Sequence, residues 1–170
     1  MAHDVDRRAF LKTFSTVAAG MALSTTGFSQ PAIGSRTKPL RGPFQIGQTP
    51  FTEDDKLDLD CLAAEVKFRN RASVPGFIWP QIASGWSTMS TSERLAGAES
   101  ILAAGKGVKT ALVIAVQTRN NDPPGAIAFA KHAARNGADA ICSLPPEGDD
   151  ATLPSCYKAI GNATDLPLFV

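Results

Sequence analysis

The stretch GAIAFAKHAARNGADAICSL, residues 125–144, predicts a helix followed at once by a short strand. The helix covers residues 125–136, and its apolar face carries Ile127, Ala130 and Ala134 at helical spacing. Gly137 ends the helix, because glycine readily adopts the left-handed conformation that closes a final turn. Residues 140–144 then form a short apolar run of the length of a buried strand. Such a helix–strand unit is the repeat of an α/β fold.

The same pattern recurs along the chain at intervals of about thirty residues, the size of one strand–helix repeat. Apolar runs predict five strands, over residues 44–49, 76–80, 110–117, 140–144 and 166–170. Stretches of helical periodicity separate them and predict four helices. Because each strand is followed by a helix, the sequence predicts a parallel sheet.

Capping signals mark where two of these helices begin, and a proline limits the start of the last one. Asp58 is a predicted N-cap, followed by an apolar stripe of Leu59, Leu62, Ala63 and Val66. Ser90 and Glu93 form a predicted capping box, which begins a helix that buries Leu95, Ala98 and Leu102. The last helix spans residues 153–163, where Pro154 is tolerated only within the first turn.

Periodicity alone does not separate a doubly wound open sheet from part of a (β/α)₈ barrel. A doubly wound nucleotide-binding fold requires a glycine-rich turn after its first strand. Here that turn, residues 49–55, has no glycine and carries the carboxylates of Glu53, Asp54 and Asp55. The sequence therefore argues against a nucleotide site at this turn.

Short motifs at predicted boundaries between elements carry a resemblance to a known family. They are residues 49–51, 57–62, 88–94, 136–140, 145–146 and 165–169. In order and spacing the chain resembles the dihydrodipicolinate synthase and N-acetylneuraminate lyase family over residues 42–170. The resemblance implies the N-terminal part of a (β/α)₈ TIM barrel, with about five strands and four helices.

The resemblance also implies a class I aldolase type of lyase acting on pyruvate or another 2-oxo acid, with a sugar acid as a further candidate. Members of the family form a Schiff base on a lysine of the sixth strand and commonly assemble as homo-tetramers. Nothing in the sequence demands a cofactor, so we expect none. This sequence stops before that strand, so the expected lysine lies beyond Val170. We therefore expect an N-terminal fragment.

The candidate site residues follow the predicted strands, because barrel enzymes act at the carboxyl ends of their strands. The substrate-binding candidates are Thr49, Gln81, Ala83, Ser84 and Arg119. Glu147 is a candidate acid or base. Residues 81–85 replace the family's Gly-Thr-Thr-Gly-Glu loop, so its threonine hydroxyls are missing, although the backbone amides near Ala83 and Ser84 remain possible donors to a carboxylate.

The lost threonines leave two other interpretations open. One is that the barrel is reused as a non-Schiff-base enzyme or as an extracytoplasmic ligand-binding protein. The other is that the chain is an inactive remnant.

The N-terminus resembles a twin-arginine export signal. Arg7 and Arg8 are followed by Phe10, Leu11 and Lys12, and the next segment is too short and polar for a stable membrane anchor. We expect a signal peptide over residues 1–29, a linker over 30–41 and the partial barrel over 42–170. The twin-arginine translocase is then a partner, and the protein is periplasmic or extracellular.

Composition excludes several other classes of function. Seventeen basic and sixteen acidic residues leave a net charge of +1, which does not favour binding to nucleic acid. Cys61, Cys142 and Cys156 lie far apart and have no metal-ligand spacing. We expect no metal site, and we expect the thiols to be inert and buried.

Overall fold

The computed structural model describes residues 38–119, 122–145 and 151–170. The predicted signal peptide, Arg7 and Arg8 included, therefore lies outside the described residues, as do residues 30–37 of the predicted linker and Glu147. No helix of the described part is long and apolar enough to cross a membrane.

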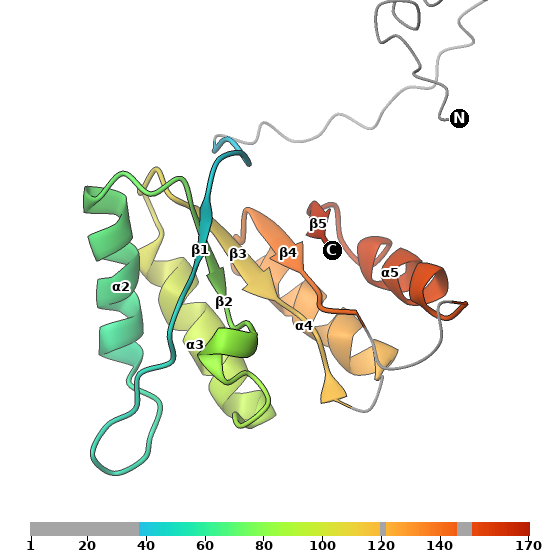
Figure 1. The fold of residues 1–170 in the computed structure, drawn as a ribbon, viewed down its shortest axis with the longest axis horizontal. Helices are drawn as coiled ribbons and strands as arrows, with labels where there is room; N and C mark the ends of the chain where they lie inside the picture. Colours follow the sequence, from blue (N-terminus) through green and yellow to red (C-terminus); the bar gives the residue numbers. More distant parts are fainter. Residues whose placement is uncertain (1–37, 120–121, 146–150) are drawn as a thin grey trace, which may run out of the picture. The chain divides into compact units, whose positions relative to one another are not determined.

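Five parallel strands form one sheet, and their order in the sheet is their order in the chain (Figure 1). The strands are β1 (Phe44–Ile46), β2 (Gly76–Trp79), β3 (Ala111–Ala115), β4 (Ala140–Cys142) and β5 (Leu168–Phe169). A doubly wound sheet changes direction and does not have this order. The strand order is instead that of a (β/α)₈ barrel, which confirms the predicted fold class.

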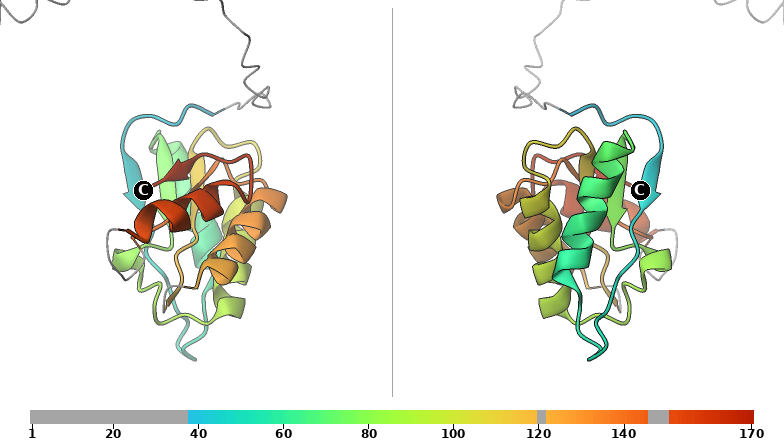
Figure 2. Two further views of the ribbon diagram at one scale, coloured as in Figure 1. Left: turned by 90° about the vertical axis from the view of Figure 1, so that its right-hand side faces the viewer. Right: turned by 90° about the vertical axis from the view of Figure 1, so that its left-hand side faces the viewer.

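Four helices connect the strands, as predicted. They are α2 (Leu59–Arg71), α3 (Thr91–Ala104), α4 (Pro123–Arg135) and α5 (Leu153–Gly161). A single 3₁₀ turn, η1 (Ile82–Ser84), follows β2. Figure 2 shows α5 beside α4 in one side view and α2 beside α3 in the other, so the helices also keep their chain order.

The predicted helix starts are confirmed in detail. The Asp58 carboxylate accepts a hydrogen bond from the Cys61 amide at 2.8 Å. The Ser90 hydroxyl accepts from the Glu93 amide, and the Glu93 carboxylate accepts from the Ser90 amide at 2.7 Å. Both caps satisfy amides that have no partner inside the helix.

The predicted buried faces of three helices are partly wrong. Leu59 is 39% exposed, because it is the first residue of α2 and lies at the rim of the helix layer. Leu95 is only half-buried, whereas its neighbour Arg94 is buried. Ala98 and Leu102 of α3 are buried as predicted, together with Arg94, Gly97 and Ile101. In α4 Ala130 is buried as predicted, but Ala126 and Ala133 are buried in place of Ile127 and Ala134, because that helix is turned by one residue from the predicted face.

The apolar residues form two clusters, one on each face of the sheet. The outer cluster contains helix residues such as Leu62 and Ile101 together with Phe77, Trp79 and Leu112. The inner cluster contains no helix residue. Its members are Val113, Ala115, Ala140 and Cys142, with Leu40, Phe44, Ile78 and Phe169 packed against them. This division is typical of a barrel, in which the helices cover the outside and strand side chains fill the inside.

The inner cluster includes one contact between the two edge strands of the sheet. The rings of Phe44 in β1 and Phe169 in β5 meet edge to face, with their centroids 5.2 Å apart. Because β1 and β5 are the first and last strands in the sheet order, the sheet must be strongly curved for these rings to touch.

Candidate functional site

The carboxyl ends of β1 and β2 are joined by hydrogen bonds that involve three predicted site residues. The Thr49 hydroxyl donates to the Ser84 carbonyl at 2.6 Å and accepts from Trp79 Nε1 at 3.0 Å. The Ser84 hydroxyl donates to the Gly47 carbonyl and accepts from the Gln81 amide. Thr49, Gln81 and Ser84 therefore lie together, and both hydroxyls already donate to the backbone.

Gln81 extends this network to β4. Its Nε2 donates to the Cys142 sulfur, and both side chains are buried. Burial raises the pKa of the Cys142 thiol to about 11, although the Gln81 contact acts in the opposite direction. Cys142 is therefore a neutral thiol at physiological pH. Of the three cysteines only Cys142 is buried, so the prediction of buried thiols is wrong for exposed Cys61 and half-buried Cys156.

The turn η1 uses one of the backbone amides proposed as a carboxylate donor. The Ser84 amide donates to the Gln81 carbonyl at 2.9 Å inside the turn. The Ala83 side chain is exposed. The structure thus places Ala83 and Ser84 at the expected strand end, with the Ser84 amide occupied.

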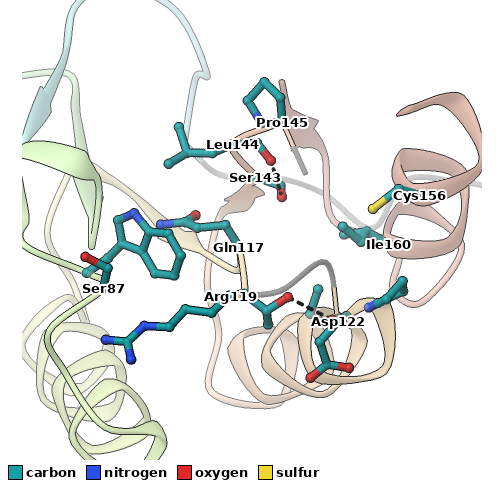
Figure 3. Close-up of a pocket in the computed structure, with 13 residues that line it drawn as sticks. Ser87, Gln117, Arg119, Asp122, Ser143, Leu144, Pro145, Cys156 and Ile160 are labelled. Carbon is teal, nitrogen blue, oxygen red and sulfur yellow. Dashed lines mark hydrogen bonds between the residues drawn. The ribbon is translucent and has the colours of Figure 1, made fainter. Parts of the chain in front are cut away.

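A cavity of about 340 Å³ lies where the chain leaves β3 and β4 (Figure 3). Its walls come from the segments that follow these strands, from α4 and α5, and from the turn before α3. The lining residues are Trp86, Ser87, Gln117, Thr118, Arg119, Asp122, Pro123, Ala126, Ser143, Leu144, Pro145, Cys156 and Ile160. Arg119 is the one substrate-binding candidate among them. The β1–β2 group of Thr49, Gln81 and Ser84 does not line this cavity.

Some polar groups of the cavity already form hydrogen bonds within the protein, and others do not. Gln117 Nε2 donates to the Pro80 carbonyl at 2.8 Å, whereas its buried Oε1 has no hydrogen-bond partner among the described residues. Asp122 caps α4 by accepting from the Gly125 amide. Figure 3 shows the Arg119 side chain extending away from Asp122, toward the side where Ser87 lies. An exposed guanidinium here suits a carboxylate or phosphate group of a ligand.

A second cavity, of about 510 Å³, continues from Arg119 along the groove between α3 and α4. His132 of α4 bonds across this groove to Glu99 of α3, with Nε2 and Oε1 2.8 Å apart. His132 therefore joins α4 to α3. Within the described residues, no group of three His, Cys, Asp or Glu side chains is placed to hold a metal ion.

Comparison with known proteins gives a match to the dihydrodipicolinate synthetase family model over residues 40–170. The chain belongs to this family. An N-acetylneuraminate lyase of Rhizobium meliloti is 30% identical over 137 residues, which are 77% of this chain and 44% of the relative. A 4-hydroxy-tetrahydrodipicolinate synthase of Methanosarcina mazei is 29% identical over 125 residues, 72% of this chain and 41% of the relative.

Solved structures of the dihydrodipicolinate synthase family share the fold. One is YagE, a prophage protein of the family from E. coli K12, in complex with pyruvate. It has a TM-score of 0.66 and 23% identity, and the match covers 72% of this chain and 42% of that one. The chain thus spans less than half the length of the relatives that it matches.

Residues 81–85, the segment that was expected to replace the family's threonine-containing loop, contain the turn η1.

One important residue was not predicted from the sequence. Arg94 in α3 is buried and reaches the carboxyl end of β3, where Nη1 donates to the Gln117 carbonyl at 2.7 Å and Nη2 to the Ala115 carbonyl at 3.0 Å. An arginine in an amphipathic helix is ordinarily assigned to solvent. The available signal was its position on the side of α3 next to Ala98 and Ile101.

Proposed function

We propose that this chain forms the N-terminal part of a lyase of the dihydrodipicolinate synthase family that binds pyruvate or a related 2-oxo acid. The observation that carries the proposal is the cavity at the ends of β3 and β4, where Arg119 offers a positive charge at the functional edge of a barrel. The family match over residues 40–170 and the pyruvate complex of a family member support the choice of ligand.

In this proposal the chain binds and orients the 2-oxo acid, and a lysine supplies the amine for Schiff-base formation. The described strands end in Ile46, Trp79, Ala115, Cys142 and Phe169. None of these is a lysine, and the resemblance to the dihydrodipicolinate synthase family implies that the nucleophile is a lysine of a sixth strand. Arg119 would hold the carboxylate of the substrate, and Glu147 is a candidate acid or base.

Binding is tested by adding pyruvate to the ¹⁵N-labelled chain and following its amide spectrum, with acetate as the matched control. We expect pyruvate to shift the amides of Ser87 and of residues 117–119, and we expect Arg119→Gln to weaken this response. An unchanged spectrum at high pyruvate concentration would disprove binding. Borohydride trapping with pyruvate on the protein extended through the next strand, followed by peptide mapping, then tests for the lysine.

A second candidate is a ligand-binding protein, or an enzyme without Schiff-base chemistry, on the same barrel. The observation that favours it is the bonding of Thr49 and Ser84, whose hydroxyls donate to the carbonyls of Ser84 and Gly47. Hydroxyls held in this way are poorly placed to relay protons. Pyruvate binding without any trapped lysine in the extended protein would favour this second function.

We also propose that the protein is exported by the twin-arginine route and acts outside the cytoplasm. The support is the Arg7–Arg8 motif with Phe10, Leu11 and Lys12 after it. Replacing both arginines with lysine should abolish export of a fused reporter, whereas replacing Lys38 and Arg41 should not. Export that persists in a strain without the translocase would count against this proposal.

A further inference from the structure

The end of β3 lacks part of the strand pairing that holds its middle. β2 pairs with β3 from Gly76 to Trp79, and the chain then turns away from the sheet. The amide of Gln81 donates to the Ser84 hydroxyl at 3.0 Å and so does not extend the ladder. The carbonyls of Ala115 and Gln117 therefore need donors from elsewhere, because buried backbone carbonyls are normally hydrogen-bonded.

Arg94 supplies both donors. Its two terminal nitrogens reach the two carbonyls at 3.0 and 2.7 Å, in the planar fork that only a guanidinium provides. On β4's side, the same segment is held by the Val116 amide, which donates to the Cys142 carbonyl at 2.8 Å. The guanidinium thus occupies the position of a neighbouring strand on the side that β2 has left.

The surroundings of Arg94 show that it is held as a buried cation by dipoles and rings. Its residue is 6% exposed, and its guanidinium carbon lies 4.1 Å from the ring centre of Phe129 and 5.6 Å from that of Trp86. No carboxylate of the described residues pairs with it. Burial, and then the nearby charge of Arg119, lower the pKa of Arg94 to about 10.

The segment that Arg94 holds carries the polar wall of the candidate site. Gln117, Thr118 and Arg119 follow β3 after Val116 and line the 340 Å³ cavity. Gln117 also closes the gap toward β2 through its bond to the Pro80 carbonyl. A change in the path of residues 115–117 would therefore move Gln117 and Arg119 together.

We infer that Arg94 is a positioning residue, whose fork replaces the missing strand beside residues 115–117 and so sets the orientation of Gln117 and Arg119 toward a ligand. The effect on a ligand rests on the proposed function. The effect on the path of residues 115–117 does not depend on any ligand. Arg94 does not itself need to touch the ligand.

The test compares Arg94→Lys and Arg94→Met with the unchanged chain, and uses Arg71→Lys on the exposed last turn of α2 as the matched control. Lysine can reach one carbonyl but lacks the fork, and methionine reaches neither. Amide hydrogen exchange of residues 116–119, pyruvate binding by amide shifts, and the melting temperature are measured for each protein. Loss of a hydrogen bond from a charged donor should raise both the amide exchange rates and the dissociation constant for pyruvate by about tenfold or more.

We expect both Arg94 variants to show faster exchange and weaker binding, with lysine affected less than methionine and Arg71→Lys unchanged. This graded loss, with a cooperative melt retained in Arg94→Lys, separates positioning from a merely structural role. Unchanged exchange in Arg94→Lys, or loss of its cooperative melt, would overturn the inference. If the unchanged chain binds no pyruvate, the proposed function fails, and the exchange rates alone decide the role of Arg94.

Discussion

The indole Nε1 of Trp79 donates to the Thr49 hydroxyl across a distance of 3.0 Å, and this hydroxyl donates in turn to the Ser84 carbonyl. Trp79 ends β2 and is fully buried, while Ser84 is the last residue of η1. One threonine thus holds a core side chain and the turn after β2 to the end of β1. Its role in this structure is to fix the edge of the sheet.

Thr49→Val should destabilise the chain, because the same-shaped valine leaves the buried indole N–H without a partner. An unsatisfied buried donor costs about 1–3 kcal/mol. Urea unfolding measures the free energy that is lost. Thr49→Ser keeps the hydroxyl, so its unfolding free energy should be closer to that of the original chain. Equal stability of the valine and serine variants would contradict the assigned bond.

Gly97→Ala should also destabilise the chain, although alanine is the better helix former. A Cβ at Gly97 would lie 2.3 Å from Cη2 of the buried Trp79 ring. Overpacking of this kind costs about 1–3 kcal/mol, and the helix propensity recovers at most about 1 kcal/mol. Gly161→Ala is the control, since the nearest atom to a Cβ at that position is Leu168 Cδ2 at 3.9 Å. The melting temperature of this variant should not fall.

Ser90→Ala should cost about 1 kcal/mol by removing the N-cap of α3. The loss should also depend on pH. Hydrogen bonds from the Ser90 amide and hydroxyl lower the pKa of Glu93 below its ordinary value of 4.5. A lowered folded-state pKa adds stability above pH 4.5 that disappears as the pH falls through the folded value.

The difference in unfolding free energy between the original chain and Ser90→Ala should therefore narrow in acid. Thr91→Ala, at the next residue, is the control, and its unfolding free energy should differ from that of the original chain by the same amount at every pH. A Ser90→Ala difference that is as large in acid as at neutral pH would count against the capping box.

Cys142 should resist thiol reagents in the folded chain. Its pKa of about 11 leaves almost no thiolate at neutral pH, and its side chain is buried. Cys61 is exposed and should react first with a disulfide reagent, so Cys61→Ser should remove the fast phase. Fast labelling that survives in Cys61→Ser and maps to Cys142 would show that the inner face of the sheet is open.

The sequence predicts the elements well where local chemistry sets their ends. Asp58 and Ser90 cap their helices as expected, because each bond joins residues three positions apart. The strands are shorter than predicted: β3 ends at Ala115 and not at Gln117. Their ends depend on where the neighbouring strand stops, which no local pattern records.

The candidate site was predicted less completely, because its important contacts join distant segments. Thr49 and Ser84 were correctly placed at strand ends, but the bonds that occupy their hydroxyls link β1 to η1. Arg94 was missed because an arginine is ordinarily assigned to solvent, although it lies on the same side of α3 as Ala98 and Ile101. Its partners are two carbonyls more than twenty positions away, which carry no sequence signal.

The edge-to-face contact of Phe44 and Phe169 has a consequence for the time course of folding. The two rings stand near opposite ends of the described chain, so they can meet only after every strand between them has been made and has paired. Contacts of such long sequence separation form slowly. On the ribosome, the ring of Phe44 therefore stays without its contact to Phe169 until β5 has emerged, even where β2, β3 and β4 have already formed beside it.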